Sequence, residues 1–187
     1  MQLLKRVVHD SITEINLTPC HPNSFTRIAS RAIVVKEDKI LLMFTERYND
    51  YSLPGGGIDK GEDLIDGLKR ELSEETGAQG IDNIVPFGLY EEYRPHRSNK
   101  HYSERTIMHM LSYCYTCDIL DEFGAQKLED YEINNGMQVR WMCIKEAIAH
   151  NINTMNNDEK QGLSIQRETF LMQQINDKLM KPMTLNM

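Results

Sequence analysis

The chain has 187 residues, of which 40% are hydrophobic and 26% are charged, a balance typical of a soluble globular protein with room for a core. Its net charge of −7, without a long basic run, argues against broad nucleic-acid binding, which requires a basic patch. No apolar stretch reaches the length of a signal peptide or a membrane span, so we expect a cytoplasmic protein that contacts neither membranes nor nucleic acid.

The first 27 residues form an N-terminal arm of mixed character. Four apolar residues in it predict a short amphipathic strand or helix: Leu3, Leu4, Val7 and Val8. The proline-containing stretch 16–24 predicts a loop. The arm could pack on the rest of the chain or complete a partner subunit, and the sequence pattern leaves both open.

Two β-rich runs follow at residues 28–35 and 39–45, separated by a polar turn that predicts a hairpin. Residues 46–50 predict an exposed loop, and residues 51–53 predict a short strand. The next turn, residues 54–57, contains three consecutive glycines, which allow the backbone to approach a ligand closely.

The densest pattern of charge comes directly after this turn, where residues 62–76 predict an α-helix that ends at Gly77. Glu62 and Asp63 suit its first turn, because acidic groups complement the positive end of a helix. One side of the helix carries the apolar residues that we expect to be buried, Ile65, Leu68 and Leu72.

On a neighbouring side of this helix, Glu71, Glu74 and Glu75 fall within about one turn of each other. Like charges at this spacing destabilise a helix by about 0.2–0.5 kcal/mol per pair. A hard divalent cation would cancel the charge, and Mg²⁺ takes oxygen ligands and shares its shell with substrate phosphates. The alternative is a solvated charged face, and the carboxylates alone do not decide between the two.

Further strands are predicted at residues 81–93, 105–119 and 137–144. The intervening stretch 94–101 is the one cationic loop, and it either receives phosphates or is a solvated hairpin tip. Arginine suits phosphate geometry, so we name three candidate substrate-binding residues, Arg47, Arg94 and Arg97.

Two features of the strand at 105–119 have structural explanations. Cys114 and Cys117 have the spacing of a metal-binding pair, but no second pair accompanies them, so we expect free thiols in the core or half-buried. His109 is expected to be a hydrogen-bonded sheet histidine, with a catalytic base as the minor alternative.

The last part of the chain contains an acidic stretch and two predicted helices. Residues 120–135 predict a polar loop, and residues 145–151 a short helix. The Asn-rich stretch 151–158 predicts a loop, and the apolar period of residues 163–180 predicts a second helix. Strands, one central helix, more strands and late helices together predict an α/β sandwich.

The segment from Gly56 to Ala78 resembles the Nudix box, Gly-x5-Glu-x7-Arg-Glu-U-x-Glu-Glu-x-Gly-U, where U is a bulky aliphatic residue. Every glycine and polar position matches, and Ala78 is smaller than the usual final aliphatic residue. The resemblance covers residues 28–152 and implies an αβα sandwich with a mixed sheet. The arm 1–27 and a C-terminal helical extension, residues 153–187, would then flank a Nudix hydrolase domain.

The resemblance also implies a pyrophosphohydrolase that uses Mg²⁺, or alternatively Mn²⁺. Its catalytic and metal-binding glutamates would be Glu71, Glu74 and Glu75, and the backbone carbonyl of Gly55 would join the metal shell. One of these glutamates could also act as the general base, and Glu71 is our candidate. Arg70 would orient a glutamate through a charge-assisted hydrogen bond.

Other acidic residues have supporting roles in this interpretation. Glu62 would support the metal ligands without contacting the metal itself. A downstream loop can supply a further carboxylate in this family, and the candidates are Glu129, Asp130 and Glu132. The alternative for these three is a loop that only improves solubility.

The substrate implied by the resemblance is a nucleoside diphosphate joined to another group. We expect an ADP-ribose or nucleotide-sugar type of compound, with dinucleoside polyphosphates and oxidised nucleoside triphosphates as alternatives, because Tyr93 and Pro95 together do not separate the subfamilies. The competing function is a nucleotide-sensing module without catalysis, but such proteins typically lose box glutamates that this chain keeps. The two extensions could serve a homodimer.

Overall fold

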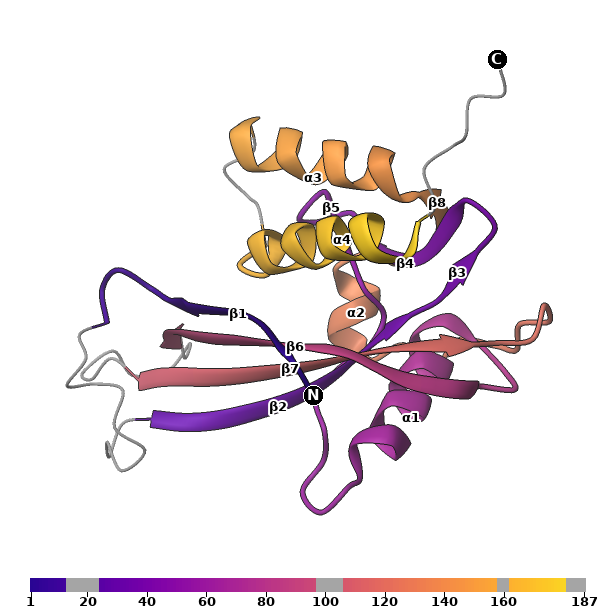
Figure 1. The fold of residues 1–187 in the computed structure, drawn as a ribbon, viewed down its shortest axis with the longest axis horizontal. Coiled ribbons are helices and arrows are strands. Elements are labelled where there is room, and N and C mark those ends of the chain that lie inside the picture. The colour runs from indigo at the N-terminus through magenta and orange to yellow at the C-terminus, as the bar shows by residue number, and fades with distance from the viewer. Residues whose placement is uncertain (13–23, 97–105, 158–161, 181–187) are drawn as a thin grey trace.

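The computed structural model describes residues 1–12, 24–96, 106–157 and 162–180. These form two four-stranded sheets with helices on opposite sides (Figure 1). The mixed α/β class that the sequence predicts is confirmed.

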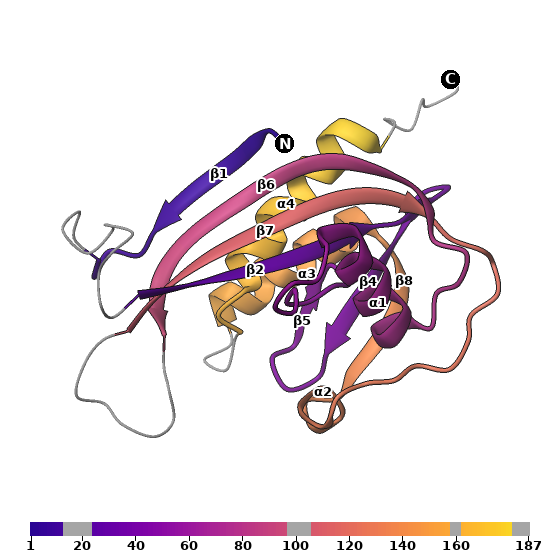
Figure 2. The same ribbon diagram turned by 90° about the horizontal axis from the view of Figure 1, so that it is seen from below.

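The first sheet is mixed and has the strand order β1-β6-β7-β2. Its strands are β1 (Leu3–Val8), β2 (Ser24–Ile33), β6 (Asp82–His96) and β7 (Thr106–Asp118). Strands β6 and β7 are antiparallel, whereas β1 runs parallel to β6 and β2 runs parallel to β7. Figure 2 shows β1 at one edge of this sheet, so the N-terminal arm begins with a strand and not with a helix.

The second sheet is built around β4. Its strands are β3 (Val35–Lys36), β4 (Lys39–Thr45), β5 (Asp50–Ser52) and β8 (Met137–Cys143). Strand β4 is antiparallel to each of the other three, and its bounds are those that the sequence predicts.

Four helices complete the fold: α1 (Leu64–Thr76), α2 (Asp130–Asn134), α3 (Ile144–Asn157) and α4 (Ile165–Leu179). Helices α3 and α4 lie on one side of the first sheet, and α1 lies on the other side (Figures 1 and 2). The sheet therefore separates the Nudix-box helix α1 from the C-terminal helices.

Local chemistry fixes both ends of α1. The side chain of Asp63 caps the N-terminus by accepting a hydrogen bond from Ile65 N at 2.8 Å. At the other end, Gly77 has the left-handed φ of 79° and its N–H donates to the Ser73 carbonyl. Leu68 and Leu72 are fully buried, as the sequence predicts.

Three predicted loops are wrong in part. Helix α2 lies inside the stretch 120–135, and α3 continues through the Asn-rich stretch 151–158 to residue 157. Residues 94–96, predicted as part of the cationic loop, belong to β6.

Tertiary hydrogen bonds explain why the Asn-rich stretch is helical. The side chain of Asn151 is buried, accepts a hydrogen bond from Tyr51 N at 2.8 Å and donates to the Tyr51 carbonyl at 2.9 Å. Thr154 donates to the Asn49 carbonyl at 2.8 Å. These bonds outweigh the low helix propensity of asparagine, which is all that the local sequence reveals.

The core has two parts, on opposite sides of the first sheet. One part includes α4 residues that are fully buried, Leu171, Met172 and Ile175. The other includes Leu68 and Leu72 of α1. Burying a side chain of this size is worth about 1.5–3 kcal/mol, so α4 contributes to the stability of the same domain that carries α1.

The residues of β7 that could be mistaken for a metal site have structural roles. Cys114 and Cys117 are buried free thiols, as predicted. His109 Nε2 lies 2.8 Å from Glu91 Oε1 in the sheet, also as predicted. Cys20 lies outside the described residues, and within the described part no helix has the length and apolar character needed to cross a bilayer.

Candidate active site

The glycine turn at residues 54–57 lies along the free edge of β2. Ser30 N of this strand donates a hydrogen bond to the Gly56 carbonyl at 3.1 Å. Gly55 has a φ of 126°, and a Cβ at this position would lie 2.2 Å from the Ser30 carbonyl oxygen. Only glycine fits there, and this fit fixes the direction of the Gly55 N–H.

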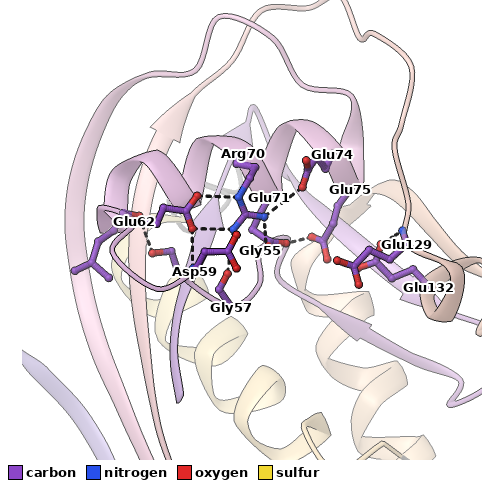
Figure 3. A network of polar contacts seen from close by, with 12 residues as sticks. Gly55, Gly57, Asp59, Glu62, Arg70, Glu71, Glu74, Glu75, Glu129 and Glu132 are labelled. Carbon is purple, nitrogen blue, oxygen red and sulfur yellow. Dashed lines mark hydrogen bonds and ion pairs between the residues drawn. The ribbon is translucent and has the colours of Figure 1, made fainter. Parts of the chain in front are cut away.

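The Gly55 N–H donates to Glu75 Oε2 at 2.6 Å (Figure 3). Glu75 is on the last turn of α1 and is only 5% exposed. Burial, with smaller contributions from the charges of Glu132 and Glu71, raises the pKa of its carboxyl group to about 8, against the hydrogen bond from Gly55. The site therefore holds a carboxyl group whose negative charge is poorly compensated.

The Glu71 carboxylate lies one turn earlier, against Gly56. A Cβ at Gly56 would lie 2.3 Å from Glu71 Oε2, so the absence of a side chain here makes room for the carboxylate. Burial also raises the pKa of Glu71, opposed by the hydrogen bond from Arg70.

Arg70 holds the remaining box glutamates together (Figure 3). Its guanidinium donates to both carboxylate oxygens of Glu62 at 2.8 and 2.9 Å. It also donates to Glu71 at 2.7 Å, to Glu74 at 3.2 Å and to the Gly57 carbonyl at 3.1 Å. These five bonds match the five N–H groups of a guanidinium, so Arg70 is fully occupied within the protein.

Arg70 lowers the pKa of Glu62, whereas burial raises the pKa of Glu75. The hydrogen bond from Arg70 lowers the pKa of Glu62 to about 2, with a smaller contribution from the Asp59 N–H. Glu62 is therefore charged throughout the physiological range and anchors Arg70 beside Glu71.

Arg31 of β2 is a neighbour of the site that the sequence analysis missed. Its guanidinium donates to the Gly55 carbonyl, the oxygen predicted to join a metal shell, and to the Leu53 carbonyl at 3.4 Å. Its positive charge also lowers the pKa of Glu71 and Glu75. A charged residue within the mostly apolar run 28–35 was the available signal.

Helix α2 brings the downstream carboxylates to the site. Figure 3 shows Glu129 and Glu132 beyond Glu75 on the side away from Arg70. Glu132 is 4% exposed and accepts hydrogen bonds from Glu129 N at 2.8 Å and Tyr131 Oη at 2.9 Å. The structure therefore places two of the three predicted extra carboxylates, Glu129 and Glu132, near Glu75.

The two predicted substrate-binding arginines that the structure describes, Arg47 and Arg94, have partners outside the Nudix box. Arg47 is exposed and donates to Asn135 Oδ1 at 3.2 Å. Arg94 lies 3.5 Å from Glu92, and burial lowers its pKa. Arg97 lies outside the described residues, so the role of all three stays a prediction.

A polar cleft of about 780 Å³ opens beside these groups. Its walls come from four parts of the chain: residues 25–28 of β2, the turn 56–62, Arg70 and Glu71 of α1, and Glu129 and Tyr131 around α2. Of the three glutamates predicted as metal ligands, Glu71 is the one that lines this cleft, so it is the best placed to meet a bound molecule.

The chemistry of the site fits a hard divalent cation. Within the described ranges, no three His, Cys, Asp or Glu side chains are grouped closely enough to enclose a metal ion. The carboxyl groups of Glu71 and Glu75 nonetheless offer oxygen ligands, and burial raises the pKa of both because it disfavours their charged forms. A cation that takes oxygen ligands would provide the missing compensation.

Comparison with known proteins agrees with the Nudix-box resemblance of the sequence. A family model described as the NUDIX domain matches residues 26–163. Diphosphoinositol polyphosphate phosphohydrolase 2 of Rattus norvegicus is 29% identical over 60% of this chain and 54% of its own length. CMP-5'-(N-acetyl-N-hydroxy-3-aminopropyl)phosphonate hydrolase of Streptomyces rubellomurinus is 28% identical over 76% of this chain and 69% of its own length.

The solved structures agree on the fold. A NUDIX hydrolase from Nitrosomonas europaea is 20% identical, with a TM-score of 0.51 over 75% of this chain and 95% of that one. The chain spans about half the length of the first curated relatives that it matches.

Proposed function

The chain belongs to the NUDIX domain family, and from this premise we propose that it is a metal-dependent hydrolase of pyrophosphate linkages in nucleoside diphosphate derivatives. The observation that carries the proposal is the buried Glu75 carboxyl, held by the Gly55 N–H beside Glu71 at the edge of a polar cleft. The names of the two relatives, both hydrolases of phosphorus compounds, support the hydrolysis of such a compound.

Four groups of this chain would hold Mg²⁺ or Mn²⁺: the carboxylates of Glu71, Glu74 and Glu75 and the carbonyl of Gly55. When bound, the cation supplies neutralisation of phosphate oxygens and a water of lowered pKa. Arg70 keeps Glu71 and Glu74 in place through its two hydrogen bonds from Nη1. The carboxylates are thus positioned before substrate arrives, which is the protein's share of the catalytic effect.

Glu71 is our candidate for the general base. Its carboxylate lines the cleft, whereas Glu74 and Glu75 do not. Burial raises its pKa toward neutrality, where a base accepts a proton from water most effectively. Glu71 would take the proton from the attacking water while Arg70 holds one of its two oxygens.

We favour ADP-ribose or a nucleotide sugar as the substrate, with dinucleoside polyphosphates and oxidised nucleoside triphosphates as alternatives. A diphosphoinositol polyphosphate is a second candidate, which only the name of the rat relative suggests. A nucleotide-sensing module without catalysis is the competing function. The four box glutamates, Glu62, Glu71, Glu74 and Glu75, argue for catalysis, because a sensor has no need of them.

We propose that the enzyme is cytoplasmic, acts on a small molecule, and requires neither nucleic acid nor a membrane. A homodimer is compatible with it, since β1 presents an edge of the first sheet (Figure 2).

The variant Glu75→Gln tests the assignment directly. It preserves the shape of the side chain but removes the charge, and we expect metal-dependent cleavage to fall by about a hundredfold or more. Initial rates with Mg²⁺ measure the loss, and thermal unfolding checks that the fold is retained. Asp66→Asn is the matched control, since it makes the same change at an exposed position of the same helix. Turnover of Glu75→Gln within a few-fold of the wild type would refute the assignment.

A further inference from the structure

Arg27 of β2 is a second arginine in the cleft, and the sequence pattern gave no indication of its role. It is exposed and lines the cleft together with Glu71. Its guanidinium lies over Gly57, because a Cβ at Gly57 would be 3.3 Å from Nη2 and 3.4 Å from Nε. Gly57 follows Gly56, which abuts the Glu71 carboxylate, so the arginine and the carboxylate face two consecutive glycines.

The hydrogen bonding of Arg27 is the opposite of that of Arg70. Arg70 uses all five N–H groups on the protein and has none left for a ligand. Among the residues that the structure describes, no acceptor receives a hydrogen bond from Arg27 and no carboxylate forms an ion pair with it. Its planar set of donors is therefore available to a molecule in the cleft.

Arg94 of β6 lies close enough to Arg27 for the two positive charges to interact. Burial is the main cause that lowers the pKa of Arg94, the charge of Glu92 raises it, and repulsion from the charges of Arg167 and Arg27 lowers it. The buried Arg167 is balanced by Glu92 at 2.6 Å and Glu168 at 2.9 Å. The Nε atom of Arg94 is buried and has no hydrogen-bond partner in the described part of the chain, although the Glu92 carboxylate lies 3.5 Å away. An anion beside Arg27 would relieve this repulsion.

We propose that Arg27 binds one phosphate of a diphosphate while the Glu71 side of the cleft receives the other, so that the site selects diphosphates over monophosphates. A guanidinium forms paired, charge-assisted hydrogen bonds with phosphate oxygens, and a lysine cannot reproduce this geometry. The inference rests on the proposed function for the identity of the substrate, but it concerns binding and can be tested without turnover.

Isothermal titration with methylenebisphosphonate and with methylphosphonate, both in Mg²⁺, provides the test. Neither compound has an anhydride bond, so binding is measured apart from hydrolysis. We expect Arg27→Ala to weaken bisphosphonate binding by at least about tenfold, the loss of a charged hydrogen bond, and to leave methylphosphonate binding unchanged. Arg27→Lys should recover only a minor part of the loss.

Lys60→Ala is the matched control, because Lys60 is an exposed cation of the same cleft in the turn before α1. We expect a change of less than threefold. An equal loss of bisphosphonate affinity in both variants would show a general effect of positive charge and not a specific site, and would overturn the inference. Unchanged bisphosphonate binding in Arg27→Ala, or no binding by the wild type, would also overturn it. A specific loss without any turnover would support Arg27 and count against the hydrolase.

Discussion

At the scale of single residues, the candidate site depends on where side chains are absent. Gly55 is required by its positive φ and by the Ser30 carbonyl, whereas Gly56 is required by the space that Glu71 occupies. The two glycines thus have different physical causes, and each positions a different glutamate. This arrangement leads to a specific prediction for Gly56.

The variant Gly56→Ala should lower turnover by about a hundredfold, because its Cβ would lie 2.3 Å from Glu71 Oε2 and the carboxylate would have to move by about 1 Å. Steady-state kinetics with a cleavable substrate measure the effect. In the control Gly61→Ala, the added Cβ meets no atom within 4 Å, but the φ of 86° is unfavourable for alanine. That variant should lose some stability and keep its turnover. Wild-type turnover in Gly56→Ala would show that Glu71 is not needed where it lies.

The sequence predicts much of the site at this scale, but only where the residues share one motif. The box defines the sequence spacing of its glutamates and glycines, and the α-helix brings glutamates at that spacing close together in space. Arg31 and Arg27 lie on β2, about 30 residues earlier, and reach the site only because β2 is the strand beside the glycine turn. The contact between an edge strand and a later loop belongs to the tertiary structure, and the sequence pattern of neither segment predicts it.

At the scale of elements, α4 supports the site through β5 and the residues after it. Glu168 Oε2 accepts a hydrogen bond from Leu53 N at 3.0 Å, two residues before Gly55. Arg167 lies beside it and is 3% exposed. Arg167 also forms a buried ion pair with Glu92 of β6 at 2.6 Å. Removing a member of a buried ion pair typically costs about 3–5 kcal/mol, so this pair fixes α4 against the first sheet.

Asp50 of β5 makes this interface sensitive to pH. Burial raises the pKa of its carboxyl group to about 6, and the negative charge of Glu168 adds to the effect, while the Gly162 N–H opposes it. The folded state therefore holds the proton more tightly than the unfolded state, whose pKa is near 3.8. Asp50 favours folding most below pH 3.8, and this contribution is lost as pH rises through about 6.

We expect Asp50→Asn to be more stable than the wild type by about 3 kcal/mol at pH 7, with little difference near pH 4, since each pKa unit corresponds to about 1.36 kcal/mol. Urea denaturation of both proteins at several pH values measures the difference. A difference that does not change between pH 4 and pH 7 would contradict the prediction.

The elements themselves were predictable where their pattern is strong. The bounds of β4 match the apolar run, and α1 ends at Gly77 as predicted, although it begins at Leu64 and Asp63 caps it from outside the helix. The end of α3 was not predictable, because Asn151 and Thr154 are stabilised by bonds to the segment 49–51 and not by their neighbours in the chain. The short helix α2 is stabilised by a capping box between Glu129 and Glu132. In the sequence these two residues are part of an acidic stretch that is typical of a loop.

At the scale of the whole molecule, the ends of the described chain both pack on the central domain. Strand β1 extends the first sheet, and α4 fills the core on the face opposite α1 (Figures 1 and 2). This layering leaves the cleft between β2, the glycine turn and α2 open, with α1 at its base. The architecture thus holds the carboxylates rigidly and leaves one side free for a substrate.

Product analysis by chromatography tests the central claim most directly. The wild type would be incubated with ADP-ribose, a nucleotide sugar, a dinucleoside polyphosphate, an oxidised nucleoside triphosphate and a diphosphoinositol polyphosphate, with Mg²⁺, with Mn²⁺ and with a chelator. We predict cleavage at a pyrophosphate bond of ADP-ribose or the nucleotide sugar, abolished by the chelator and by Glu75→Gln. Failure to cleave any compound with either metal, while a nucleotide raises the melting temperature, would contradict the hydrolase and indicate a sensing module.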